Sequence, residues 1–399
     1  MDLIGWVIFI VALLVSVMLH ETGHFVLAKK FGMKVNRYFV GFGPTIWSTW
    51  RGETEYGIKA LPFGGFVKII GMHSLDDPDD PADEPRSFRS KPAWQRITVL
   101  AAGSAMHFLL ALFLIFGLAL GVGIANDNTT QLGTVAACVP KNVTALDNGT
   151  CTGSDPVAPA KQAGLQVGDT VVALNGHPVS TFTQLGAAIR AVPAWSPVTI
   201  TVKRDGKLVT LTTVAAGVPG RNGSYLGIAP AVVFQVASPL GAIDYAGTTF
   251  GQVLSGSVRA VAALPGALPK LFAKDRSSTA AGQVSSVVGA AEATGTAVAS
   301  SAGWQYKVSF VLLLIASLNI FVGVFNMLPL LPLDGGHIAV IIFERIRAWL
   351  ARLRGRPDPG LANMAKLLPV SFSLFTILIF FSVVLILADI VNPVTIPGG

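Results

Sequence analysis

Residues 3–27 read LIGWVIFIVALLVSVMLHETGHFVL, and this stretch decides the class of fold. A helix that crosses a hydrocarbon core of about 30 Å needs roughly 20 apolar residues, which the stretch supplies. Three ionisable side chains, His20, Glu21 and His24, interrupt its second half. Such side chains are costly within lipid and mark functional sites in membrane proteins. The stretch therefore predicts a membrane span that carries a functional site.

The composition of the whole chain excludes a single soluble domain. Of its 399 residues, 52% are hydrophobic and only 13% are charged, and the mean hydropathy is +0.61. Three further stretches are long and apolar enough to cross a membrane, at residues 97–124, 308–333 and 368–388. We therefore predict a polytopic α-helical membrane protein with four transmembrane helices.

Lysine and arginine gather in two of the loops between these spans, which indicates how the chain is oriented. The first loop holds Lys29, Lys30, Lys34, Arg37, Arg51, Arg86, Arg89, Lys91 and Arg96, and the second holds Arg345, Arg347, Arg352, Arg354 and Arg356. Short loops rich in these residues stay in the cytoplasm, so both termini and the segment between the second and third spans are predicted to lie outside. The net charge of +7 is mostly accounted for by these loops, and no nucleic-acid partner is predicted.

The loop after the first span has two parts of different character. Residues 37–70 contain aromatic and β-branched runs punctuated by glycine, and they are unusually apolar for a cytoplasmic loop. We predict a β-loop that dips into the bilayer, with a hairpin turn at residues 50–54. The acidic run at residues 76–84 is predicted to be a solvated loop, because its spacing matches no EF-hand.

Residues 126–216 are predicted to form an inserted α+β domain outside the membrane. Its expected elements are strands at 170–174, 198–202 and 208–212 and a helix at 182–191. Residues 217–305 are rich in Ala, Gly and Ser and predict a linker with amphipathic helices that lie on the membrane or on the protein. Residues 1–125 and 306–399 then form the N-terminal and C-terminal membrane halves.

The two cysteines, Cys138 and Cys151, both fall in the segment placed outside, where a disulfide persists. We predict that they pair. The alternative is two small buried thiols, because the sequence does not show the geometry that a disulfide requires.

The first span contains His20, Glu21 and His24 in the pattern H-E-x-x-H. Positions four apart share one face of a helix, so both imidazoles can bind one cation. Glu21 then lies beside the cation, where it can take a proton from a bound water molecule. Zinc hydrolases usually take a third protein ligand and leave the fourth position to water.

Asp334 is the candidate for this third ligand. It follows Pro329 and Pro332, which break the helix, and precedes Gly335 and Gly336. The alternative is that Asp334 begins a turn or caps the next helix. Topology favours the ligand, because both histidines and Asp334 lie toward the cytoplasmic ends of spans that run inward. The three side chains are therefore expected at one depth.

At these residues the chain resembles the site-2 protease family of intramembrane zinc metalloproteases. The order of spans is similar to the bacterial branch that cleaves anti-sigma factors, and the resemblance covers most of the chain. It implies an endopeptidase of the bacterial inner membrane with one Zn²⁺, held by His20, His24 and Asp334, and with Glu21 as the catalytic base. The substrate implied is a single-span membrane protein, cut within or near its span after a site-1 type protease has trimmed its outer domain.

Two further motifs resemble the family's substrate-binding parts. Gly41 and Gly43 belong to a Gly-Phe-Gly-Pro run that looks like the family's motif in the β-loop. Asn326 corresponds to a position near the scissile segment, where it would hold the substrate backbone or steady the oxyanion. Its alternative role is to satisfy backbone groups freed by Pro329 and Pro332.

The outer domain resembles the PDZ domains of bacterial proteases. The similar positions are Pro159, Ala160, Ala163, Gly164, Leu165, Gly168, Asp169, Asn175 and Gly176. The resemblance implies a single PDZ domain that gates substrate access, with Gly164 and Leu165 among its substrate-binding residues.

The second span departs from the family pattern. The family commonly shows Ala-Gly-Pro followed by Asn, whereas Ala102, Gly103 and Ser104 here lead to His107. His107 either replaces the family's polar contact near the site or bonds a neighbouring helix.

Two other classes of function remain open from the residues alone. A membrane scaffold that holds proteins through its outer domain would not explain Glu21 between two histidines. A metal transporter would explain buried ligands, yet it needs polar residues along a path through the bilayer, and beyond the cluster His107 is almost the only one.

Overall fold

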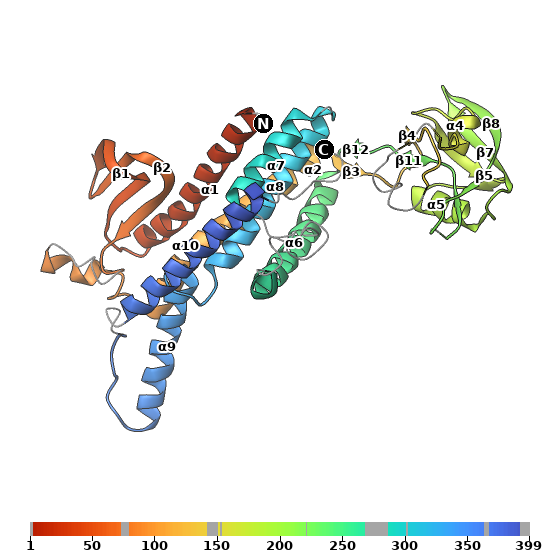
Figure 1. Ribbon diagram of the computed structural model, residues 1–399. Helices are drawn as coiled ribbons and strands as arrows, with labels where there is room; N and C mark the ends of the chain where they lie inside the picture. Colours follow the sequence, from red (N-terminus) through yellow and green to blue (C-terminus); the bar gives the residue numbers. More distant parts are fainter. Residues whose placement is uncertain are drawn as a thin grey trace. The chain divides into compact units, whose positions relative to one another are not determined.

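The computed structural model describes residues 3–72, 80–141, 151, 154–220, 222–267, 286–300, 302–362 and 367–391. The chain divides into two compact units. Unit 1 comprises Met1–Val122 and Ala237–Gly399, and unit 2 comprises Gly123–Val236. Figure 1 labels the elements of both.

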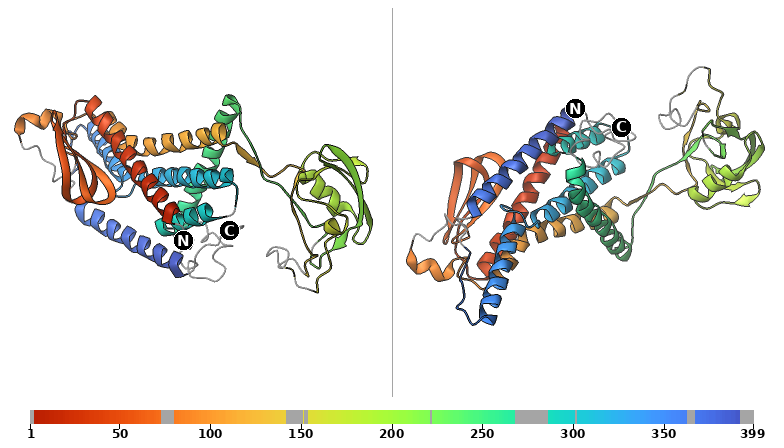
Figure 2. Two further views of the ribbon diagram at one scale, coloured as in Figure 1. Left: turned by 90° about the horizontal axis from the view of Figure 1, so that it is seen from above. Right: turned by 60° about the horizontal axis from the view of Figure 1, so that its bottom comes forward.

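Unit 1 contains four helices that are long and apolar enough to cross a membrane. They are α1 (Leu3–Lys30), α2 (Ala93–Gly121), α8 (Trp304–Asn326) and α10 (Leu368–Val391). α2 packs against both α1 and α8, and Figures 1 and 2 show these three running alongside one another. The predicted multi-pass membrane protein is confirmed. α8 ends at Asn326, before the expected end of that span at residue 333.

Two long strands follow α1, and Figure 1 shows them beside that helix. β1 (Val35–Arg51) and β2 (Thr54–Ile69) pair with a register that shifts repeatedly. Phe39 is partnered by both Gly57 and Phe66, so the first part of β1 lies between two portions of β2. The face turned outward is apolar, with exposed Phe42, Ile46, Trp47, Trp50, Ile58 and Leu61.

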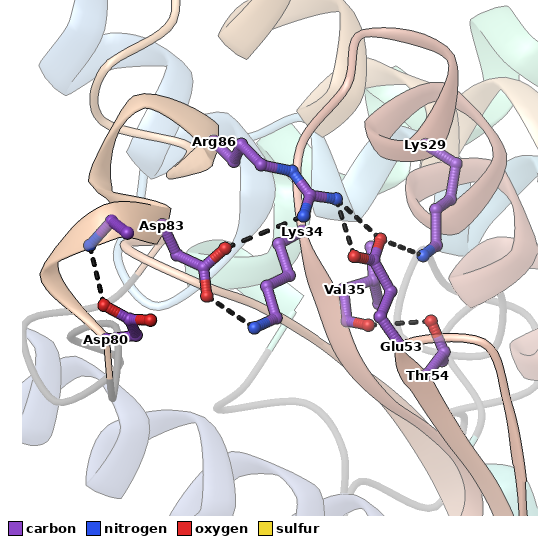
Figure 3. A network of polar contacts seen from close by, with 9 residues as sticks. Lys29, Lys34, Val35, Glu53, Thr54, Asp80, Asp83 and Arg86 are labelled. Carbon is purple, nitrogen blue, oxygen red and sulfur yellow. Dashed lines mark hydrogen bonds and ion pairs between the residues drawn. The ribbon is translucent and has the colours of Figure 1, made fainter.

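A polar network fixes the turn between these strands, as Figure 3 shows. Glu53 in the turn accepts hydrogen bonds from Lys29 at the end of α1 (2.7 Å) and from Arg86 (2.8 and 2.7 Å). Partial burial opposes ionisation of Glu53, but these two cations outweigh it and hold the pKa of the carboxyl below its usual range. The turn is thereby tied to the end of α1.

The acidic run is only partly the solvated loop that was predicted. Its last residues form a 3₁₀ helix, η1 (Pro81–Arg86), whose N-terminal amide at Ala82 donates to Asp80. Asp83 accepts from Lys34 at 2.5 Å, and Glu84 pairs with Arg89 at 2.6 Å. These ion pairs order the segment. Asp76, Asp77 and Asp79 lie outside the described residues.

The segment rich in Ala, Gly and Ser contributes two helices to unit 1. α6 (Pro239–Ala267) packs against α2 and α8, and α7 (Val287–Ala299) packs against α1, α8 and α10. Small residues allow the close approach: Ala246 of α6 shares a buried cluster with Ala111 of α2 and Ala316 of α8. Both helices therefore pack on the other helices of unit 1, as one of the two predicted arrangements has it.

Unit 2 is built on a four-stranded sheet in the order β6-β5-β7-β8. The strands are β6 (His177–Pro178), β5 (Thr170–Leu174), β7 (Pro197–Arg204) and β8 (Lys207–Val214). The helix α5 (Phe182–Ala191) adds Leu185 and Ile189 to a core with Val171 and Ile200. Alternation along β7 buries Val198, Ile200 and Val202, which is the period-two pattern of a strand with one face on a core.

Short paired strands and the small helix α4 (Pro159–Gln162) complete unit 2. β3 (Ile124–Asn126) pairs with β12 (Val233–Gln235), β4 (Leu132–Val135) with β11 (Ile228–Pro230), and β9 (Ala216–Gly217) with β10 (Ser224–Tyr225). A disulfide joins Cys138 and Cys151. The membrane protein thus carries a β-rich inserted region, as predicted.

Candidate metal centre

The last third of α1 presents two imidazoles on one buried face. His20 and His24 are one helical turn apart, and their Nε2 atoms lie 3.0 Å from each other. His24 Nδ1 lies 2.7 Å from the carbonyl oxygen of Val99 in α2. A carbonyl only accepts, so Nδ1 carries the proton and the Nε2 lone pair is left free for a cation.

Asp334 meets these imidazoles from a distant part of the sequence. It is the first residue of α9 (Asp334–Leu353), and its Oδ2 lies 3.3 Å from His20 Nε2 and 3.5 Å from His24 Nε2. The three ligand atoms lie within 4.8 Å of one another. The N-cap of α9 is Leu333, and no side chain caps the helix. Asp334 is therefore the first helical residue, and its carboxylate lies in the cluster and does not cap the helix.

The residues fit a divalent cation on their own chemistry. Two neutral imidazoles and one carboxylate form a donor set that zinc takes in catalytic sites. Asp334 Oδ2 is buried and makes no hydrogen bond among the described residues, which is costly unless a cation satisfies it. His20 Nδ1 is likewise buried without a hydrogen-bond partner among them.

Glycines let the neighbouring elements approach the ligands. A Cβ added at Gly103 of α2 would lie closer than 3.0 Å to both imidazoles. At Gly335 and Gly336 it would meet the backbone of residues 327–331 at similarly short range. The Asp-Gly-Gly sequence is thus required by packing, because the break before α9 folds tightly over the start of that helix.

Glu21 lies on α1 between the two histidines and is half-buried. Its Oε2 accepts a hydrogen bond of 2.9 Å from the backbone nitrogen of Val67 in β2. The carboxylate is therefore held by the backbone of β2.

Comparison with known proteins agrees with this geometry. Residues 8–356 match the family model described as "Peptidase family M50". The chain belongs to this peptidase family. It is 37% identical to proteins named "Zinc metalloprotease Rip1" from Mycolicibacterium smegmatis and from Mycobacterium tuberculosis, over 98% of each chain. It is also 29% identical, over 86% of its length and 88% of the relative's, to a protein of Fusobacterium nucleatum named "Putative zinc metalloprotease FN1322".

The chain is therefore an intramembrane zinc metalloprotease of the M50 family, and the cluster of His20, His24 and Asp334 is consistent with its zinc site. The predicted site-2 protease resemblance, enzyme class and cofactor are confirmed. The scaffold and transporter alternatives are no longer needed.

A buried polar triad adjoins the ligands in this M50 peptidase. His107 of α2 donates through Nδ1 to Asn319 Oδ1 of α8 at 2.8 Å and lies 3.1 Å from Ser16 Oγ of α1. Ser16 Oγ also donates to Asn319 Oδ1. The His107 ring is 5.0 Å from that of His20. His107 thus bonds a neighbouring helix, which was one of its two expected roles, and it does so next to the site.

Sequence reasoning missed Ser16 and Asn319 as members of this triad. Asn319 is 1% exposed within an apolar span, and a carboxamide at such a position has to be hydrogen-bonded. The presence of a buried carboxamide in an apolar span could therefore have indicated a hydrogen-bonded position. Its partners could not be predicted, because they depend on how α1, α2 and α8 are rotated relative to one another.

The residues expected to bind substrate fall in three places. Gly41 and Gly43 lie in β1 with φ of +84° and +85°, a conformation that glycine adopts freely. Asn326 is the last residue of α8 and is half-buried. Gly164 and Leu165 belong to unit 2, where Leu165 is 5% exposed and packs in the core.

Unit 2 also contains a cavity of about 500 Å³, which lies between α5 and the segments around β4 and β11. Phe182, Gly186 and Ile189 line it from the helix, and Cys138 and Cys151 also border it. Gly164 and Leu165 are not among its lining residues.

Proposed function

We propose that His20 Nε2, His24 Nε2 and Asp334 hold one Zn²⁺, and that Glu21 is the general base of peptide hydrolysis. The convergence of three ligand atoms within 4.8 Å, from α1 and α9, carries the proposal. When bound, zinc supplies a Lewis acid that acidifies a water molecule and polarises the scissile carbonyl.

Three residues of the chain have separate roles in the proposed hydrolysis. Glu21 accepts the proton of the attacking water and returns it to the leaving amine. The amide of Val67 fixes one carboxylate oxygen of Glu21, which leaves the other oxygen to move the proton. Asn326 steadies the substrate backbone or the oxyanion from the end of α8.

The experiment that tests the base compares wild-type protein with Glu21→Gln in detergent, on a trimmed single-span substrate. We expect cleavage to fall by about 10² to 10⁴-fold, because general acid–base catalysis contributes that much. Zinc content should stay near one ion per chain, since Glu21 is not a ligand. Asp334→Ala should instead lose the zinc. Equal cleavage by wild type and Glu21→Gln would sink the assignment.

The substrate segment must unwind before it is cut, because a helix hides its carbonyls in hydrogen bonds. We propose that β1 and β2 bind the freed strand by edge pairing. Support comes from the contact of Val67 with Glu21, which brings the edge of β2 beside the proposed base. Gly41 and Gly43 allow the bend in β1 that such a surface requires.

The physiological setting proposed is the bacterial inner membrane, with both termini and unit 2 outside. The substrate would be a single-span membrane protein such as an anti-sigma factor, cut after an upstream site-1 type protease has removed its outer domain. Cysteine-accessibility labelling at Ala82 and at Ala187 tests the orientation: label should reach Ala187 from outside and Ala82 from the cytoplasm.

Unit 2 is proposed to be a PDZ domain that excludes substrates with bulky outer domains. Its cavity beside α5 is the proposed groove. Gly186→Trp would fill the cavity, whereas Ala187→Trp places the same side chain on an exposed position of α5 outside the lining. We expect only Gly186→Trp to permit cleavage of untrimmed substrate. If it leaves such cleavage undetectable while trimmed substrate is cut normally, the gate is contradicted.

A further inference from the structure

The helix α9, which begins at the metal centre, has two faces of opposite environment. Its inner face buries Ile338, Ile341, Glu344 and Ala348, spaced three or four residues apart. Ile338 and Ile341 join a core with Val99 and Leu100 of α2. This face is fully occupied, and it holds α9 on the bundle.

The opposite face carries large apolar side chains that stay well exposed in the part of the chain that the structure describes. They are Ile342, Phe343, Ile346, Trp349, Leu350 and Leu353, with exposed fractions of 47%, 56%, 51%, 58%, 38% and 66%. Their spacing of one, three, three, one and three residues places them in one stripe along the helix. A stripe of this size in water is unfavourable.

Arginines border the stripe on both sides. At about 100° per residue, Arg345 and Arg352 lie on one flank, and Arg347 and Arg354 lie on the other. Arg354 is the C-cap residue directly after the last helical residue, and Arg356 follows two residues later. Few nearby carboxylates neutralise the charge of these arginines. Glu344 is buried and paired with Arg96 at 3.0 Å, and Asp358 comes no closer than 3.9 Å to Arg352.

The pattern of side chains on this face indicates what kind of partner would cover it. An apolar stripe with a tryptophan and flanking arginines matches a helix that lies in a membrane interface. A second copy packed face to face across a two-fold axis would bring arginines against arginines, which repel. An anionic lipid surface accepts the stripe between its chains and the arginines at its headgroups.

We propose that the Ile342–Leu353 face of α9 is a docking surface for anionic lipid. α9 starts at Asp334, directly after the break that follows α8, and Figure 1 shows it at the lower end of the group of helices. Lipid contact along this face restrains the helix that carries the third ligand.

The test places a fluorescent probe on the stripe in the whole protein. The two native cysteines are bonded to each other, so Ile346→Cys supplies one reactive thiol, and Ala82→Cys on η1 is the matched exposed control. Each protein is reconstituted into phosphatidylcholine vesicles with or without phosphatidylglycerol, with a constant fraction of lipid carrying a quencher on its chains. We expect quenching at position 346 only, and more of it with phosphatidylglycerol.

A charge variant separates anionic recognition from simple apolar contact. Arg345→Gln, Arg352→Gln and Arg354→Gln together should lower the ratio of lipid-facing to water-facing probe at 346 at least about tenfold in the phosphatidylglycerol vesicles. Arg51→Gln, Lys161→Gln and Arg259→Gln remove the same charge from exposed positions elsewhere and should leave it unchanged.

Three results would overturn the proposal. If aqueous iodide quenches the probe at position 346 as strongly as the probe at position 82, the stripe lies in water. Shielding from both the lipid quencher and iodide would mean that protein covers the face. If quenching by the lipid is the same with and without phosphatidylglycerol, and the same in the arginine variants, the face does not recognise anionic lipid. The readout uses no catalysis, so its outcome is independent of the peptidase assignments.

Discussion

Gly103 of α2 faces both imidazoles of the metal centre. A Cβ there would approach His20 Cε1 and His24 Nε2 closer than 3.0 Å, so the ligands or α2 must shift. We predict that Gly103→Ala weakens zinc binding by about 10 to 100-fold, the range seen when groups that orient ligands are disturbed. Competition with a chelator measures it. Gly117→Ala on the same helix meets nothing within 4 Å and should bind zinc as wild type does.

Asp169 and Arg204 give unit 2 a dependence on pH. Hydrogen bonds from Arg204, at 2.7 and 2.6 Å, hold the pKa of the Asp169 carboxyl below its usual range despite its burial. A carboxyl with a depressed pKa in the folded state stabilises that state above its ordinary pKa of 3.8 and loses this effect as pH falls through the depressed value.

Asp169→Asn should therefore speed amide exchange in β5 and β7 at neutral pH by at least about tenfold, because a hydrogen bond to a charged group is lost. Amide exchange of the full-length protein, corrected for intrinsic rates, measures this. In acid below the depressed pKa, wild type and variant should converge. A difference that persists there would show that the charge is not the cause.

At the scale of elements, one buried ion pair joins α2 to α9. Arg96 and Glu344 are 3.0 Å apart with side chains only 7% and 8% exposed, and Glu344 Oε1 also accepts from the amide of Ala362. The pair holds the helix that carries Asp334. Arg96 lies about one turn before Val99, whose carbonyl accepts a hydrogen bond from His24. The same part of α2 therefore contacts His24 directly and holds the helix that carries Asp334.

Arg96→Met should destabilise the protein by about 3 to 5 kcal/mol, because it leaves a buried carboxylate unpaired. It should also lower zinc content. The double variant Arg96→Met with Glu344→Met removes both charges and should recover most of the stability. Thermal unfolding in detergent and metal analysis measure the two effects. A double variant no better than the single would mean that the pair acts through something other than its charges.

At the scale of the whole molecule, the metal centre and unit 2 have separate cores. The core of unit 2 contains residues between Leu132 and Ile228 alone, while the proposed ligands come from α1 and α9 of unit 1. Removing zinc with a chelator should abolish cleavage, and added zinc should restore it. Amide protection in β5, β7 and α5 should stay unchanged throughout. Loss of protection in those elements on chelation would show that the two units are coupled.

The spans and the shared helix face of His20 and His24 could be predicted from the sequence because their signals are local. A run of apolar residues needs no partner to indicate a membrane helix, and His20 and His24 share a face through helix geometry alone. The strand Thr170–Leu174 and the helix Phe182–Ala191 of unit 2 also have the bounds expected from their hydrophobic periods. In each case the deciding interactions lie within a few residues.

The sequence by itself determined the membrane class, the H-E-x-x-H motif and the candidacy of Asp334. Only the tertiary structure decided what those residues meet. Packing of α1, α2 and α8 brings Ser16, His107 and Asn319 together, and packing of α9 on α2 turns an apolar, arginine-flanked stripe outward. The rotation of one helix against another is set by side chains distant in sequence, whose complementarity no local pattern records.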